Sequence, residues 1–516
     1  MNLLKSVATV SSFTLLSRIT GLIRDTLLAR IFGASEAMDA FFVAFRIPNL
    51  LRRLFAEGAF SQAFVPLLGR IKSNQGDEAA YEVIDAVAII LLWAVIIISI
   101  IGIVAAPYVV WLMASGWAVN KPDTFTTTVL LTKIMFPYIA CMSLVAMASG
   151  VLNTWRHFAV PAFTPVLLNI AMIGAAWFLT PYFNPPIVAL AIGVMLGGVA
   201  QLTVQLLALK RLGVMPRLNI SIQSAWRHTG TRTVLKNMAP ALLGVGVSQI
   251  ALLINTQIAS HLAQGSVSWL SFADRLMEFP TALLGVALGT VLMPSLTKAA
   301  TQNDTKEFSQ LLDWGLRLTF LLAIPAALML VLMSEPLVAT LFHYGKFSRH
   351  DVTMTQTSVS TYALGLLGFS LVKILAPAFY AQQNIKTPVK IAIAALIITQ
   401  IANLLTVPWF GHAGLTLSIS IGAVLNASLL FFGLWRTKRY TAQLGWLTFF
   451  MQLGVGIAAI SAWMIWAVPQ LDWLALQHTP WLRVLYLLGI CMVSAMVYFG
   501  SLFLVGVRLK SFTRKI

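Results

Sequence analysis

Long apolar segments follow one another through nearly the whole of this sequence. A helix that crosses a bilayer needs about 20 mostly apolar residues, and fourteen segments meet this requirement. They are residues 7–32, 37–69, 83–114, 126–152, 159–180, 186–209, 234–262, 266–297, 310–343, 353–381, 388–407, 411–435, 446–468 and 481–507. Only 10% of the residues are charged, against about 25% in soluble domains. The sequence therefore predicts an all-α polytopic membrane protein with 14 transmembrane helices.

The basic residues predict the orientation of these helices. Twenty-two of the 35 Lys and Arg residues fall in connections on the same side as the N-terminus, and four fall on the other side. Cytoplasmic loops carry the excess of basic residues, so both termini are predicted to be cytoplasmic. The N-terminal segment lacks a small-residue cleavage site, and we expect the first span to remain in the mature protein.

A weak internal repeat predicts the domain organisation. VPLL at 65–68 resembles MPSL at 293–296, and NTWRHFAVP at 153–161 aligns with YAQQNIKTP at 380–388, at nearly the same offset. An offset of six spans keeps the orientation, which indicates two parallel six-helix lobes. The predicted parts are an N-lobe at 1–217, a cytoplasmic linker at 218–233, a C-lobe at 234–440, and two additional spans with a cytoplasmic tail at 441–516.

The second apolar segment carries charges in its middle. They are Asp39, Arg46, Arg52, Arg53 and Glu57. A charge at the centre of a bilayer costs about 2.5–3.5 kcal/mol on insertion scales, so these side chains are expected to face a protein interior or an aqueous cavity. Four of the five share one helical stripe, because they are separated by seven, seven and four residues.

Two other segments contribute more charges at membrane depth. The first segment contains Arg18 and Arg24, and the eighth contains Asp274, Arg275 and Glu278. One interpretation is that these charges form internal ion pairs that hold the helices together. The other is that arginines in excess of the acids bind an anion, and the planar guanidinium suits a phosphate in particular.

Sites for covalent or metal chemistry are not predicted. We find no Walker loop, no HExxH motif and no Cys/His spacing typical of a metal site. The two cysteines, Cys141 and Cys491, lie in apolar segments and are interpreted as buried small residues. The sequence therefore predicts neither a nucleotide-driven pump nor a metal-dependent transferase, and we expect no catalytic residues, no metal site, no cofactor, no enzymatic activity and no nucleic-acid partner.

The charged segments contain or adjoin four longer motifs, which are SRITGLIRD at 17–25, DAFFVAFRIPNLLRRLFAEGAFSQAFVP at 39–66, GSVSWLSFADRLMEFP at 265–280 and NIKTPVK at 384–390. With these motifs the sequence resembles the MurJ (MviN) family of lipid II flippases, which belongs to the multidrug/oligosaccharidyl-lipid/polysaccharide exporter superfamily. The resemblance implies two six-helix lobes around a central cavity, with two C-terminal helices that guide the lipid tail. It also implies an inner-membrane protein of peptidoglycan synthesis, with membrane lipids around it and other cell-wall synthesis proteins as further possible partners.

The substrate implied by the resemblance is lipid II, an undecaprenyl-pyrophosphate-linked disaccharide pentapeptide. Arg18, Arg24 and Arg275 would bind the pyrophosphate during alternating access, while Asp39, Arg46, Arg52, Arg53, Glu57 and Glu278 would set the charge of the cavity or act in gating. A membrane potential or an ion gradient could supply the driving force. Some relatives hold sodium with acids on spans 7 and 11, but these two spans contain no Asp or Glu here.

Two alternative functions remain open at this point. The first is export of cationic drugs, or of other polyprenyl-linked oligosaccharides, by a member of the same superfamily. A drug exporter would be expected to line its cavity with acids and aromatic residues, whereas arginine dominates here. The second is a scaffold or a membrane-bound transferase, and a transferase would need a positioned acid or metal site in a loop.

Overall fold

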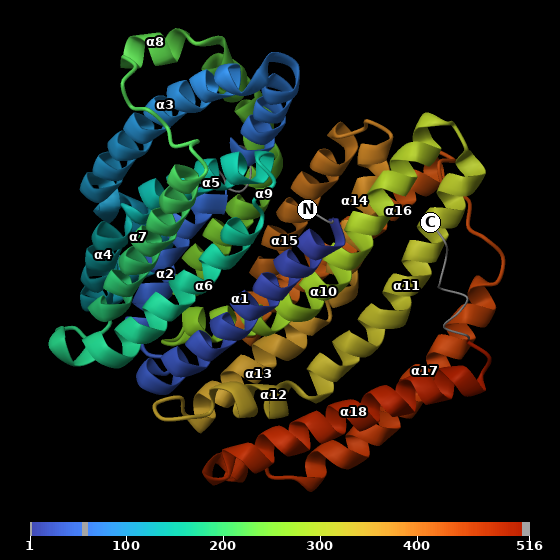
Figure 1. Ribbon diagram of the computed structural model, residues 1–516. Coiled ribbons are helices and arrows are strands. Elements are labelled where there is room, and N and C mark those ends of the chain that lie inside the picture. Colours follow the sequence, from blue (N-terminus) through green and yellow to red (C-terminus); the bar gives the residue numbers. More distant parts are fainter. Residues whose placement is uncertain (1–2, 54–59, 508–516) are drawn as a thin grey trace. The chain divides into compact units, whose positions relative to one another are not determined.

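The computed structural model describes residues 3–53 and 60–507. Side chains are described within these ranges except at residues 3–8, 51, 239–245, 247–248 and 283–291. Throughout these ranges the chain is helical and contains no strand, which confirms the predicted all-α class (Figure 1).

The helices of the first half are α1 Leu3–Phe32, α2 Glu36–Leu51, α3 Ser61–Asn120, α4 Pro122–Met135, α5 Tyr138–Thr154, α6 Ala159–Gly174, α7 Val188–Arg211, α8 Ile222–Arg227 and α9 Thr229–Ser260. Short π and 3-10 turns, Ala175–Leu179 and Thr180–Tyr182, follow α6. The helices of the second half are α10 Ser266–Thr301, α11 Thr305–Leu332, α12 Ser334–Phe342, α13 Arg349–Ala363, α14 Leu366–Ala381, α15 Lys386–Phe410, α16 His412–Arg436, α17 Trp446–Ala467 and α18 Pro480–Leu504.

Nine helical stretches within the described ranges are long and apolar enough to cross a membrane, and a bent pair, α13 with α14, raises this number to ten. The helices α1, α2, α9 and α10 are outside this set; α2 has only 16 residues, and the other three include residues whose side chains are not described. The protein is thus a multi-pass membrane protein, and the total of 14 spans stays a prediction.

Several predicted spans are not single straight helices. The predicted span 126–152 consists of α4 and α5, which meet at Phe136–Pro137, where proline supplies no backbone N–H. The span 353–381 consists of α13 and α14, which are bent by 40° relative to each other. α3 is interrupted at Gly76, whose φ of 88° is accessible to glycine, and this interruption falls in the predicted connection between the second and third spans.

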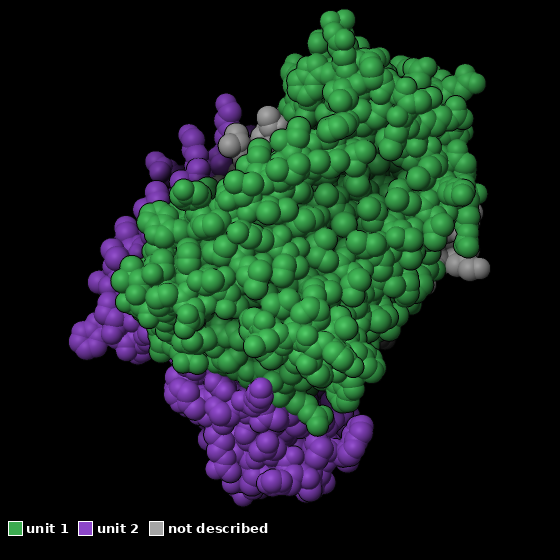
Figure 2. Space-filling view, turned by 90° about the vertical axis from the view of Figure 1, so that its left-hand side faces the viewer, with its two compact units in different colours: residues 1–268 green, residues 269–516 purple. Residues whose placement is uncertain are grey.

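The described residues form two compact units, which are residues 1–268 and 269–516 (Figure 2). In unit 1, α6 packs between α1 and α7, α5 packs on α3 and α7, and α9 lies along α3. One apolar cluster in this unit includes Phe60, Phe64, Val83, Met147 and Leu209. The division into two lobes joined by a linker at 218–233 stays a prediction.

In unit 2, α16 packs on α13, α14 and α15, and α11 packs on α14. The last two helices, α17 and α18, pair with each other, and they contact α11 and α12 respectively. At the α17 end, the Asp313 carboxylate accepts hydrogen bonds from the Tyr440 hydroxyl at 2.8 Å and from the Trp446 indole at 2.6 Å. Burial, together with this bond to Asp313, raises the pKa of Tyr440 above its ordinary value.

Candidate substrate-binding residues

Arg24 is held in place by a polar network between α1 and α6. Its Nε and Nη2 donate to Oδ1 of Asp25 at 2.8 and 2.6 Å, and its Nη1 donates to Oδ1 of Asn169 at 3.0 Å. The amide of Asn169 donates in turn to the carbonyl oxygen of Ser17 and to the hydroxyl of Thr20. The side chains of Arg24 and Asp25 are mostly buried, with 14% and 9% of their surface exposed. The guanidinium of Arg24 therefore has a defined orientation.

Arg18 lies six residues before Arg24 on α1 and is half-buried. Its guanidinium makes no hydrogen bond or ion pair with any residue in the described ranges. An arginine has five N–H donors in a planar fork. All five are therefore available to an anionic ligand, which distinguishes Arg18 from its paired neighbour Arg24.

Asp39 does not pair with an arginine of its own helix. It is 3% exposed, and its two oxygens accept from the backbone N–H groups of Gly265 and Ser268, both at 2.8 Å, and from the Ser268 hydroxyl at 2.6 Å. Gly265 immediately precedes α10 and Ser268 lies in its first turn. Unpaired N–H groups at a helix N-terminus favour a carboxylate. Where one interpretation of the sequence was an ion pair among the membrane charges, Asp39 binds the donors at the start of α10.

The arginines of the second predicted span have separate surroundings. Arg46 donates to the hydroxyl of Thr256 on α9, and Arg52 donates to Oδ1 of Asn49 at 2.7 and 3.1 Å. Arg53 is exposed. Glu57 lies outside the described residues, so its predicted role stays a prediction. Arg46 and Arg52 lie close together in the sequence, but the partner of Arg46 is on α9 and that of Arg52 is on α2 itself.

Arg275 and Glu278 belong to unit 2, where they form an ion pair on α10. The Nη1 of Arg275 lies 2.9 Å from Oε2 of Glu278, and the two side chains are 30% and 47% exposed. Such an accessible pair contributes about 0–1 kcal/mol to stability. A phosphate with two or three charged oxygens can therefore compete with Glu278 for this guanidinium.

Two of the important contacts were not anticipated from sequence. Asp25 stands next to Arg24 in an apolar segment, and its position could have indicated the pair; Asn169 gives no such local signal. Arg483, which is counted in the sequence among the four basic residues of the connections on the side opposite to the N-terminus, lies in the first turn of α18 and not in a connection. Its side chain is fully buried, it donates to the carbonyl oxygens of Trp473 and His343 at 3.3 Å each, and it lies 4.8 Å from the Tyr344 ring centre.

Within the described ranges, no group of three or more His, Cys, Asp or Glu side chains is placed to hold a metal ion. Both cysteines are free and partly buried.

Comparison with known proteins gives one consistent result. Residues 28–487 match the family model described as lipid II flippase MurJ. The chain is 52% identical over 515 residues to a curated lipid II flippase MurJ from Burkholderia cenocepacia, with 100% of both chains covered.

Solved structures agree with this match. A lipid II flippase MurJ in an inward closed conformation has a TM-score of 0.76 at 25% identity, covering 96% of this chain and 99% of that one. A multidrug transporter of the MATE family in an inward-facing conformation has a TM-score of 0.69 at 15% identity, covering 84% and 98%, and shares the fold alone.

Proposed function

Because the chain belongs to the MurJ family of lipid II flippases, we propose that it moves lipid II from the cytoplasmic to the periplasmic leaflet of the inner membrane by alternating access. The observation that carries this proposal is the 52% identity to a curated flippase along the full length of both chains. No covalent bond of the substrate is made or broken, so the protein is a transporter and not an enzyme. The rival reading as a drug exporter rests on a shared fold alone.

Arg18 is proposed as the principal ligand of the pyrophosphate. An unpaired guanidinium in a membrane-spanning helix is unfavourable, and a diphosphate that accepts its hydrogen bonds removes that cost. Arg24, whose orientation is set by Asp25 and Asn169, would contribute charge and a fixed direction of approach. Arg275 would exchange its partner Glu278 for a phosphate oxygen, since its ion pair is accessible.

The other charged residues would act without direct contact to the phosphate. Asp39 would fix the start of α10 against α2, while Arg46, Arg52, Arg53, Glu57 and Glu278 would set the local charge or act in gating. Both termini are proposed to be cytoplasmic, because the basic residues concentrate in the corresponding connections. A membrane potential or an ion gradient is proposed as the driving force.

The test is a flipping assay in proteoliposomes that contain labelled lipid II. Arg18→Gln keeps the length of the side chain and removes its charge. The loss of two charge-assisted hydrogen bonds, at about 1.5–3 kcal/mol each, predicts a loss of flipping rate of at least about tenfold. The matched control is Arg30→Gln, since Arg30 is an exposed arginine of the same helix, and it should change the rate less than about twofold.

Arg24→Glu reverses the charge beside Asp25 and should abolish flipping while the protein still inserts into the membrane. Normal flipping by both Arg18→Gln and Arg24→Glu would contradict the pyrophosphate site. Imposing a potassium diffusion potential or a sodium or proton gradient on the same vesicles identifies the driving force. Transport of a cationic dye in place of lipid II would favour the exporter alternative.

A further inference from the structure

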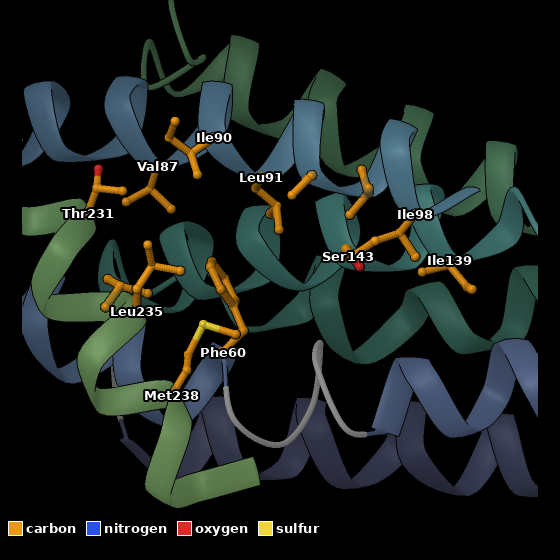
Figure 3. A pocket seen from close by; sticks show the side chains of 13 residues that line it. Phe60, Val87, Ile90, Leu91, Ile98, Ile139, Ser143, Thr231, Leu235 and Met238 are labelled. Atoms are coloured by element: carbon orange, nitrogen blue, oxygen red, sulfur yellow. The ribbon is translucent and has the colours of Figure 1, made fainter. Parts of the chain in front are cut away.

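Unit 1 contains a cavity that the proposed transport reaction does not use. Helices α3, α5 and α9 border a cavity of about 160 Å³ (Figure 3). From α3, the lining side chains recur every three or four residues from Val87 to Ile98, which is one face of the helix. Figure 3 shows Leu91 of α3 facing Leu235 and Met238 of α9 across the cavity.

The walls of this cavity favour a hydrocarbon chain. Apart from two hydroxyl side chains, all lining residues are apolar, and an apolar cavity of about 150 Å³ stays dry and accepts hydrocarbon ligands. The lining face of α3 from Val87 to Ile98 is about 16 Å long at 1.5 Å per residue, which suits an extended fatty acyl chain better than a compact molecule. Helices α3 and α5 belong to stretches that are long and apolar enough to cross a membrane, so lipid is the medium around this side of the cavity.

One end of the cavity offers a hydrogen bond that no described residue takes. The Thr231 side chain is 2% exposed, and its hydroxyl has no hydrogen-bond partner in the described part of the chain. A buried hydroxyl without a partner is unfavourable. Because Thr231 lines the cavity near the beginning of α9, an ester oxygen at the head of an acyl chain could accept its hydrogen bond.

Basic side chains stand beside the same end. Arg232 and Lys236 directly follow the lining residues Thr231 and Leu235, and both are exposed and make no ion pair with a described residue. Arg227, at the end of α8, is also exposed. The acids of the adjoining turn of α3 are Glu82, which is exposed, and Asp85, which accepts from the backbone N–H of Arg217 at 2.7 Å. Positive charge is in excess here, which favours an anionic headgroup.

We propose that this cavity binds one acyl chain of an anionic phospholipid. The chain would lie between α3 and α9, the ester group would meet Thr231, and the phosphate would meet Arg232 and Lys236. The leaflet concerned is the cytoplasmic one if the proposed topology holds. The bound lipid would support α9, the first helix after the linker, against α3.

The experiment counts the phospholipids that stay with the full-length protein. The protein is reconstituted in vesicles of equal phosphatidylglycerol and phosphatidylcholine, extracted in mild detergent and analysed by lipid mass spectrometry. Wild type should retain one phosphatidylglycerol per chain in preference to phosphatidylcholine. Ala94→Trp places an indole in the cavity and should lower retention by at least about fivefold. Ile97→Trp, on the 52% exposed outer face of the same helix, is the matched control and should retain the lipid.

Two further variants separate the chain site from the headgroup site. Thr231→Val keeps the side-chain volume and should weaken retention of either lipid, while Arg232→Gln with Lys236→Gln should leave a bound lipid but abolish the preference for phosphatidylglycerol. These two variants decide the question if Ala94→Trp does not fold, as judged by gel filtration. Three outcomes would each overturn the proposal. They are equal retention by all variants, retention of a polyprenyl chain in place of a phospholipid, and equal retention of both phospholipids by wild type. Flipping is measured separately, so either proposal can fail alone.

Discussion

At the scale of single residues, the membrane arginines differ in what they bind. Arg18 makes no hydrogen bond with a described residue, Arg24 is oriented by Asp25 and Asn169, and Arg275 has an accessible acid beside it. Arginines that look alike in the sequence, each within an apolar segment, therefore differ in their surroundings in the folded protein. The position of an acid next to each arginine, and its burial, decides which arginine can exchange partners.

The Asp25–Arg24 pair leads to a prediction at this scale. Asp25→Asn removes the carboxylate from a mostly buried guanidinium, and leaving a buried charge with one neutral acceptor should lower the free energy of unfolding by about 1–3 kcal/mol. Thermal or denaturant unfolding in detergent measures this change. Asp77→Asn is the control, because Asp77 pairs with Lys72 at 3.7 Å on the surface and should change stability by less than about 0.5 kcal/mol. Equal stability of both variants would contradict the structural role of the pair.

At the scale of helices, two side chains from elsewhere in the sequence hold helix ends. Asp39 of α2 binds the first turn of α10, and Arg483 of α18 binds backbone carbonyls that follow α12 and that lie before α18. In each case a buried charge satisfies backbone groups that a helix end or a loop leaves unpaired. Without Asp39 the start of α10 would fray, and without Arg483 the segments next to α12 and α18 would do so.

For α10 the prediction concerns its first turn. Asp39→Asn should lose charge-assisted hydrogen bonds worth about 1–2 kcal/mol, the usual cost of a lost helix cap. Hydrogen–deuterium exchange should then accelerate by about tenfold at residues 266–270. Ser35→Ala removes the cap of α2, whose hydroxyl accepts from Met38 at 3.3 Å, and should affect α2 alone. An unchanged exchange rate at α10 in Asp39→Asn would show that the carboxylate is not needed there.

For α18 the prediction concerns its attachment to α12. Arg483→Met leaves two buried carbonyl groups without donors and should lower the free energy of unfolding by about 1–3 kcal/mol. Exchange or proteolysis should increase first in the connection around residues 475–478. Arg483→Lys, which loses the planar fork but keeps the charge, should have a smaller effect. Arg349→Met, at an exposed position at the start of α13, should be neutral, and a similar loss there would argue against a specific anchor.

At the scale of the whole molecule, topology can be measured directly. In a background with Cys141→Ala and Cys491→Ala, a cysteine at Arg436 should react with a membrane-impermeant maleimide only from the cytoplasmic side. A cysteine at Val119, which is 81% exposed, should react only from the opposite side. Reaction of both positions from one side would contradict the proposed orientation and the leaflet assigned to the bound phospholipid.

Composition and apolar segments were sufficient to predict the helical membrane fold and the set of membrane charges, while the family was indicated by four sequence motifs. These properties are local, because the length of an apolar run and the cost of burying a charge depend on nearby residues only. The breaks at Phe136–Pro137 and between α13 and α14, and the packing of α9 on α3, were not predicted. They depend on which helices become neighbours.

The partners of the charged side chains were decided by the tertiary structure. Arg24 finds Asn169 across 145 positions, Asp39 finds Gly265 across 226, and Arg483 finds His343 across 140. No periodicity in the sequence relates such residues. Hydrogen bonds act over about 3 Å, so only folding determines which donor and acceptor meet. The sequence by itself determined that these charged side chains need hydrogen-bond partners. The tertiary structure determined which groups those partners are.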